Sequence, residues 1–285
     1  MDASVAGTAI GPMVIAAVEQ YEDHPLVRDE FAARILPLSG RLAVAAARWR
    51  PMRNALVSAT EKRIPGLWAG MLCRKRYVDE RLTTTDADAV VVLGAGFDTS
   101  GCRLRDKPVF EVDLPGTIAS KRERLRAMFG EVPSNVSLVP IDFEAQGLEE
   151  ALGERGYRRD VRTLFVWEAV TQYLTADAVG ATFGFLAQAP AGSELVFTFV
   201  RKDFLDGTAM FGGEAAYREF VQNRQIWKFG LLPAEVAEFV AAFGWAEVEQ
   251  LGPREFTERY LVPSGRVSPV SEIERVVRCV KVAGR

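Results

Sequence analysis

The sequence predicts an α/β fold, a doubly wound and mostly parallel sheet of seven strands with helices on both faces. First, residues 90–93 (Val-Val-Val-Leu) contain no polar side chain, as a strand buried on both faces requires. Second, such runs alternate with helical periodicity from residue 89 onward. Third, the first run ends in Gly94-Ala95-Gly96, a tight turn of the kind that leads from a strand into a helix. Alternation of this kind builds parallel sheets with right-handed crossovers.

Seven apolar runs are the predicted strands. They cover residues 90–93, 109–112, 137–141, 163–167, 194–199, 247–251 and 276–280. Helical periodicity lies between them, at residues 116–129, 148–153, 176–188, 214–229 and 233–243. The order of runs and helices is that of a doubly wound sheet.

Two insertions flank this pattern. Residues 1–85 are predicted to form a helical N-terminal cap, because their apolar residues recur at helical spacing between breaks at prolines. The cap is expected to pack onto the core, residues 86–285, rather than to fold separately. Residues 201–230 contain seven aromatic or methionine side chains and two adjacent glycines, which suggests a helical lid insertion with a hinge, although ordinary helix packing explains the aromatics as well.

Composition excludes several classes of protein. The three cysteines are far apart with no CxxC spacing, so neither a disulfide framework nor a zinc knuckle is expected. His24 is the only histidine, which excludes a metal site built from several histidines and leaves catalysis without an obvious histidine base. We therefore expect no metal.

Charge and hydropathy point to a cytoplasmic protein. The formal net charge is −3 with no basic run, which argues against a nucleic-acid partner. The apolar stretch 6–18 is interrupted by Gly11 and Pro12 and is shorter than the roughly 20 residues that span a bilayer. The start of the chain carries Asp2 and lacks the basic region of a secretion signal. We expect no membrane partner.

The glycine turn and the acid that follows it predict a nucleoside site. Ligands of open α/β sheets bind at the carboxyl ends of the strands, and Gly94 and Gly96 let the backbone approach a ligand there. Asp113 ends the second predicted strand, seventeen residues after Gly96, where an acid can accept hydrogen bonds from ribose hydroxyls. Nicotinamide dinucleotides and S-adenosylmethionine both carry that ribose.

The residues after the turn favour S-adenosylmethionine. A dinucleotide fingerprint has a third glycine where this chain has Thr99, and Asp98 would repel a pyrophosphate. S-adenosylmethionine has no phosphate, and its sulfonium and ammonium groups are cationic. Carboxylates nearby are therefore compatible with it.

Two further strand ends carry acids. Asp142-Phe143 follows the third predicted strand and could contact adenine, with the carboxylate on its amino group and the ring against its face. A helix-capping aspartate and a core phenylalanine are equally compatible with the local sequence. Glu168 follows the fourth strand and could hold the ammonium of the donor, or it could be a capping or solvated acid.

Several motifs in order resemble those of the leucine carboxyl methyltransferases. They are Arg74-Lys75-Arg76-Tyr77-x-Asp79, Gly94-Ala95-Gly96-x-Asp98-Thr99-x-x-x-Arg103-Leu104-x-Asp106, Glu111-Val112-Asp113-Leu114-Pro115 with Lys121, Asp142, and Glu168-Ala169-Val170-x-x-Tyr173-Leu174. The likeness runs from about residue 74 to residue 260. It departs at Ser100, where many relatives have arginine.

The resemblance implies a class I S-adenosyl-L-methionine-dependent methyltransferase with a Rossmann-like methyltransferase fold, releasing S-adenosyl-L-homocysteine. By that likeness Arg74 binds the methionine carboxylate of the donor, although Arg76 could take this role. The donor site is then expected to comprise Arg74, Gly94, Ala95, Gly96, Asp98, Asp113, Leu114, Asp142, Phe143 and Glu168.

The acceptor is expected to be a carboxylate on a small molecule. A carboxylate with a pKa near ~4 is already ionised at neutral pH, whereas a phenol near ~10 usually needs a base. The bacterial branch that the chain resembles methylates carboxyl groups of polyketide-type secondary metabolites. Tyr173 could donate to such a carboxylate and Arg201 could pair with it. The alternatives are a hydroxyl or a protein C-terminal carboxylate as acceptor, a nicotinamide-dependent oxidoreductase, and a non-catalytic nucleoside-binding protein.

Overall fold

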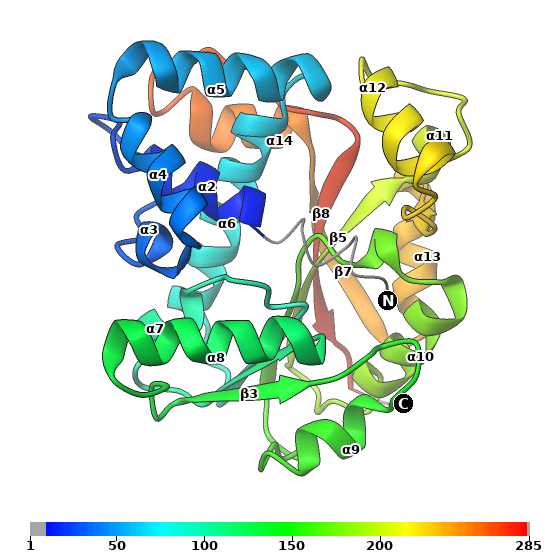
Figure 1. Cartoon of the computed structure of the whole chain (residues 1–285). Helices are drawn as coiled ribbons and strands as arrows, with labels where there is room; N and C mark the ends of the chain where they lie inside the picture. Colours follow the sequence, from blue (N-terminus) through cyan, green and yellow to red (C-terminus); the bar gives the residue numbers. More distant parts are fainter. Residues whose placement is uncertain (1–9, 284–285) are drawn as a thin grey trace.

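A central sheet lies between two layers of helices. Further helices from the N-terminal part of the chain, drawn in blue, lie at the upper left of Figure 1. The computed structural model describes residues 10–283, so the first nine residues of the predicted cap and the last two of the core lie outside the described residues. In the described range no helix is both long and apolar enough to cross a membrane.

All seven predicted strands are present. They are β1 (Ala89–Leu93), β2 (Val109–Asp113), β3 (Val136–Pro140), β4 (Thr163–Trp167), β5 (Glu194–Arg201), β7 (Trp245–Leu251) and β8 (Glu274–Lys281). An eighth strand, β6 (Gly230–Leu231), was not predicted, because two residues give no periodicity to detect. It pairs in parallel with the last residues of β5.

The strand order is β3-β2-β1-β4-β5-β8-β7, with β6 beside β5. All pairings are parallel except those of β8, which runs antiparallel to both β5 and β7. The chain moves outward from β1 to β3 and then returns to place β4 on the other side of β1. The order therefore reverses between β1 and β4, and the crevice at their carboxyl ends is where ligands bind in such sheets.

Successive residues of each strand point to opposite faces of the sheet, and both faces are buried. In β1, Val91 and Leu93 belong to one hydrophobic cluster and Val90 and Val92 to another. One face is covered by α9 (Leu148–Gly153), α10 (Ala176–Leu186) and α13 (Val236–Ala241). The other is covered by α6 (Leu67–Thr84), α8 (Pro115–Phe129) and α14 (Pro253–Phe256).

The predicted cap consists of helices that share the core. They are α2 (Ile10–Glu19), α3 (Ala32–Ile35), α4 (Leu38–Ala46), α5 (Arg50–Arg63) and α6. Leu72 and Tyr77 of α6 lie in one cluster with Val90 of β1, so α6 covers the sheet directly. Helices α2, α3 and α4 share a hydrophobic cluster with α8 and β3, whereas α5 packs against α6 (Figure 1). We expect the cap to be inseparable from the sheet, because its apolar residues are buried in the same clusters.

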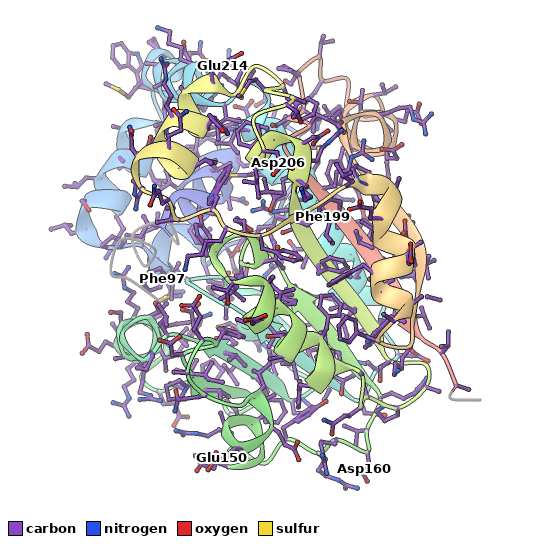
Figure 2. All side chains as sticks on the ribbon, turned by 90° about the vertical axis from the view of Figure 1, so that its right-hand side faces the viewer. Phe97, Glu150, Asp160, Phe199, Asp206 and Glu214 are labelled. Atoms are coloured by element: carbon purple, nitrogen blue, oxygen red, sulfur yellow. The ribbon has the colours of Figure 1, made fainter. Side chains whose placement is uncertain are left out.

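The 201–230 segment is less helical than the sequence predicts. It contains α11 (Lys202–Leu205), α12 (Glu214–Ala216) and a π-helix at Tyr217–Asn223. The helix predicted to reach residue 229 ends at Asn223, because Gln225 adopts a left-handed backbone with φ of 51°. Figure 2 shows Asp206 and Glu214 at the end of the molecule opposite to Glu150 and Asp160, which precede β4. The segment therefore lies where the parallel strands finish.

Four short helices complete the described chain. They are α7 (Ser100–Arg103), a 3₁₀ helix at Thr171–Tyr173, a 3₁₀ helix at Pro233–Glu235 and a π-helix at Thr257–Leu261 that continues α14. The helical stretch 253–261 was not predicted. The 3₁₀ helix at Thr171–Tyr173 matters most for function, because it follows β4 at the crevice.

Candidate active site

A cavity of about 400 Å³ lies at the carboxyl ends of the parallel strands. Its walls come from α6, the turn after β1, the segments after β2 and β4, the 201–230 segment and the start of β8. The volume is typical of small-molecule sites, which hold roughly 300–1,000 Å³. On one side the wall is an apolar cluster that we call the lid cluster, formed by Ile64, Leu67, Val200, Phe220, Trp227 and Ile273. The rest of the lining includes the predicted donor residues other than Asp142.

The turn after β1 requires glycine at its first position. Gly94 has φ of 74°, and a Cβ there would lie 2.1 Å from Cγ2 of Val170. Gly96 also has a positive φ, 46°. The N–H groups of Gly94 and Ala95 both donate to the carbonyl oxygen of Val112, at 2.7 and 2.9 Å. The turn therefore presents bare backbone to the cavity.

Asp113 is fixed beside this turn. Its Oδ2 accepts the N–H of Gly96 at 2.7 Å, and its Oδ1 accepts the N–H of Leu114, also at 2.7 Å. Burial raises the pKa of Asp113, and these two N–H groups oppose that rise. The Thr117 side chain also hydrogen-bonds this carboxylate, which has about four acceptor positions, so at least one position is left for a ribose hydroxyl.

Arg74 lies between two carboxylates at the cavity wall. Its Nε donates to Oε1 of Glu168 at 2.6 Å, and its Nη1 donates to Oε2 of Glu274. Burial works against the charge of the guanidinium, but the two carboxylates outweigh it and hold the pKa of Arg74 above its usual value. Burial also raises the pKa of Glu168, against the effect of Arg74. Arg76, the other candidate for the donor carboxylate, is exposed and pairs with Glu80. Of these two arginines, only Arg74 lines the cavity.

Asp98 lines the cavity, and its carboxylate is hydrogen-bonded to residues of α6 and α7. Its Oδ2 accepts Nζ of Lys75 at 2.6 Å, and its Oδ1 accepts the N–H of Ser100 at 2.6 Å. Burial opposes ionisation, yet Lys75 and Arg103 hold the pKa of Asp98 well below its usual range. Asp98 is therefore an anion at neutral pH and fixes the start of α7 relative to α6.

The predicted adenine residues are placed differently from each other. Phe143 is buried and lines the cavity, as does Leu114. Asp142 is not among the lining residues, and its Oδ1 accepts the N–H of Glu144 at 3.1 Å in the turn after β3. The structure therefore brings Phe143 to the donor side and gives Asp142 a turn-forming contact.

Of the two predicted acceptor residues, only one lines the cavity. Tyr173 lines the cavity at the end of the 3₁₀ helix after β4. Arg201 lies outside the lining, where it pairs with Asp203 at 2.5 Å and with Glu272, and its guanidinium is 4.4 Å from the ring centre of Phe211. Its charge is already paired with these two carboxylates, so we do not carry Arg201 into the acceptor site.

Comparison with known proteins shows which family the chain belongs to. The sequence profile of leucine carboxyl methyltransferases matches residues 9–187, more than half of the chain. The chain belongs to the leucine carboxyl methyltransferase family. A protein of Mycolicibacterium paratuberculosis, provisionally described as an S-adenosyl-L-methionine-dependent methyltransferase, is 27% identical over 83% of this chain and 77% of its own. One of Mycobacterium tuberculosis with the same description is 29% identical over 73% and 69%. The fold resembles that of a provisionally described methyltransferase from Thermobifida fusca, with a TM-score of 0.61, 16% identity, and 96% and 95% of the two chains covered.

Membership of the family establishes S-adenosyl-L-methionine as the cofactor, and the cavity fits it. The charged residues that line the cavity are three cations and four carboxylates, a formal charge of −1: Arg63, Arg74, Lys75, Asp98, Asp113, Glu168 and Glu274. S-adenosylmethionine carries two positive groups and one carboxylate. The net charge of the donor, +1, is therefore opposite in sign to that of the cavity lining.

Glu274 was missed by sequence reasoning. It begins β8 and lies opposite Val200, near the end of β5, because β8 runs antiparallel. Its Oε1 is buried with no hydrogen-bond partner among residues 10–283. From the sequence, a residue is predicted to lie at the crevice only if it follows a strand that is assigned as parallel. An acid at the start of the last strand becomes a candidate once that strand is assigned as antiparallel.

We expect the stability contribution of Asp98 to depend on pH. Its folded-state pKa is depressed, so its ion pairs stabilise the fold above the unfolded pKa of about 3.9, and this stabilisation is lost as the pH falls towards the folded pKa. Asp98→Asn should lower the free energy of unfolding by about 1.5–3 kcal/mol at pH 7. Urea unfolding of both proteins between pH 7 and pH 3 should show the difference shrinking below pH 4. A difference that stays constant over this range would contradict the assignment.

Proposed function

We propose that the protein transfers the methyl group of S-adenosylmethionine to a carboxylate oxygen of a small, largely apolar metabolite of polyketide type, forming a methyl ester. The observation that carries this proposal is the composition of the acceptor side of the cavity. Its walls include the lid cluster, and the hydroxyl-bearing side chains of Tyr173 and Ser271 line the same cavity. His24, the only histidine of the sequence, is exposed and does not line the cavity. A site without a base favours an acceptor that is already ionised.

The protein's own residues would act mainly by position. The donor supplies a methyl group activated by its sulfonium. Asp113 would hold the ribose, Phe143 would lie against the adenine, and Arg74 and Glu168 would hold the carboxylate and the ammonium of the methionine portion. Tyr173 would donate a hydrogen bond to the acceptor carboxylate and aim it at the methyl group. Holding the reacting atoms in line and excluding water account for most of the acceleration of such a displacement.

Two alternative acceptors remain outcomes of the test. A hydroxyl acceptor would need a base. Most carboxylates of the cavity wall (Asp98, Glu168 and Glu274) are tied into ion pairs with Lys75 and Arg74, and Asp113 already accepts two backbone N–H groups. A protein C-terminal carboxylate would need an opening for a chain end, whereas a cavity of about 400 Å³ suits a small molecule. The nicotinamide-dependent oxidoreductase is dropped, because the family uses S-adenosylmethionine.

The experiment begins with calorimetric titration of S-adenosylmethionine, S-adenosylhomocysteine and NAD. We expect both adenosyl compounds to bind and NAD not to bind. Turnover is then measured with trideuteromethyl donor against matched aromatic acids, phenols and a peptide ending in leucine, with mass spectrometry of the products. Label on an acid that mild alkali removes identifies a methyl ester. Label that resists alkali identifies an ether, and a labelled peptide points to the protein-modifying alternative.

A further inference from the structure

We propose that Gln172 and Trp227 bind the acceptor carboxylate through neutral hydrogen bonds, in a pocket shaped for a flat aromatic acid. The inference rests on the proposed function and extends it to the class of substrate. Both side chains line the cavity. The Oε1 of Gln172 and the Nε1 of Trp227 are buried and have no hydrogen-bond partner in the described part of the chain, and Gln172 as a whole is only 4% exposed.

An unpaired buried polar atom is costly. Leaving one without a partner costs about 1–3 kcal/mol, and most buried polar groups are therefore paired. The indole nitrogens of Trp167 and Trp245 are also unpaired, but they lie in the core, whereas Gln172 and Trp227 line the cavity, where a bound molecule can supply the missing partners. The indole N–H can only donate. The amide of Gln172 can turn by 180°, which replaces Oε1 by the donor Nε2. With the hydroxyl of Tyr173, the wall can offer three donors to one carboxylate.

The two side chains are held together by the backbone. The carbonyl oxygen of Gln172 accepts the N–H of Lys228 at 2.6 Å, so the residue after Trp227 is bonded directly to Gln172. The 3₁₀ helix that carries Gln172 is anchored to β5, since Oγ1 of Thr171 donates to the carbonyl oxygen of Thr198 at 2.7 Å. The donor pair therefore stands on the sheet itself rather than on a free loop.

No cation of the cavity wall is free to take the acceptor. Arg63 pairs with Glu219, Arg74 with Glu168 and Glu274, and Lys75 with Asp98. Neutral donors suit the chemistry better than a cation would. The carboxylate loses its negative charge as the ester forms, so a cation would stabilise the ground state more than the transition state and would raise the barrier.

Trp227 is also part of a stacked pair of aromatic rings on the cavity wall. The rings of Phe220 and Trp227 stack, with centroids 4.8 Å apart and planes 20° apart. The guanidinium of Arg63 lies 5.3 Å from the ring centre of Phe220 on the same wall. Offset stacking against such a surface favours a planar acceptor over a flexible chain. The structure thus points to an aromatic carboxylic acid.

The test uses 2-naphthoate as the probe, titrated into protein saturated with S-adenosylhomocysteine. We expect Trp227→Phe, which keeps a ring and removes the N–H, and Gln172→Leu each to weaken 2-naphthoate binding five- to tenfold. Gln172→Glu places a like charge beside the carboxylate and should abolish binding. Trp49→Phe is the matched control. Trp49 is the residue before α5, is 66% exposed and does not line the cavity, so this substitution should leave the affinity for 2-naphthoate unchanged.

S-adenosylhomocysteine affinity is measured for every variant and should stay within twofold of the wild type, which shows that the donor side is intact. If 2-naphthoate fails to bind, or if Trp227→Phe and Gln172→Leu leave its affinity unchanged, the proposed acceptor site is wrong while the donor site stands. If S-adenosylhomocysteine itself does not bind the wild type, the proposed function fails first and the acceptor site falls with it.

Discussion

Asp113→Ala is expected to weaken the binding of S-adenosylmethionine and S-adenosylhomocysteine about 100-fold, or about 2.7 kcal/mol. The carboxylate has two tasks at once. It would accept a ribose hydroxyl, and it already accepts the N–H groups of Gly96 and Leu114, which set the shape of the turn. Hydrogen bonds to charged groups contribute about 1.5–3 kcal/mol each, so losing such a bond accounts for an effect of this size.

Asp113→Asn separates the two tasks. The amide keeps one acceptor oxygen and nearly the same shape, so we expect it to retain part of the turn and to weaken binding about tenfold. Calorimetric titration with S-adenosylhomocysteine measures both variants without the need for an acceptor. Asp160→Ala is the control, because Asp160 is exposed near the opposite end of the molecule (Figure 2). Wild-type affinity in Asp113→Ala would mean that the ribose lies elsewhere in the cavity.

The sheet and the donor side could be predicted because they depend on local sequence. A strand buried on both faces must be apolar over its whole length, so residues 90–93 are recognisable without any other part of the chain. The glycine turn and Asp113 follow from the strand ends, since parallel strands bring their carboxyl ends to one edge. The motif around Arg74 located that residue on the cavity wall, although α6 precedes the sheet in sequence.

The acceptor side could not be predicted in the same way. Glu274 reaches the cavity only because β8 is antiparallel, which no local pattern reveals. Gln172 and Trp227 are far apart in sequence and meet through a backbone hydrogen bond to Lys228. Arg201 is the last residue of β5, at the edge where ligands bind, yet Asp203 lies two residues later and pairs with it. Pairing between side chains decides which charges are available, and that depends on the folded geometry.

Asp142 and Phe143 both follow β3, yet their side chains have different surroundings. Of these two neighbours, only Phe143 lines the cavity. Phe143 does so because its ring joins the core cluster that includes Trp167 and Val170. Asp142 instead accepts the N–H of Glu144, as the capping alternative allows. A pair of adjacent candidates is thus best treated as two separate predictions.

Lys121→Met is expected to destabilise the protein by about 3–5 kcal/mol, the largest stability effect that the structure suggests. Nζ of Lys121 lies 2.8 Å from Oε2 of Glu111, and both side chains are almost fully buried beneath the glycine turn. The same Nζ is 3.4 Å from the carbonyl oxygen of Ala95, so the pair also supports the turn from below. Removing the cation leaves Glu111 buried with no opposite charge, which is far more costly than losing an exposed ion pair. Urea unfolding at pH 7 measures the change. Lys202→Met is the control, since its pair with Asp206 is exposed and should contribute little.

The pH dependence of the variant distinguishes an unpaired charge from a packing defect. Burial already raises the pKa of Glu111, and loss of Lys121 must raise it further. A carboxyl group whose folded pKa lies above its unfolded value takes up a proton on folding. Its cost is therefore absent below the unfolded pKa of about 4.3 and grows as the pH rises towards the folded pKa. Lys121→Met should accordingly be less unstable at pH 5 than at pH 8. In the double variant Glu111→Gln with Lys121→Met the buried charge is gone, so most of the lost stability should return and the pH dependence should disappear. A double variant as unstable as Lys121→Met would show that the lysine acts through its packing or through Ala95 rather than through Glu111.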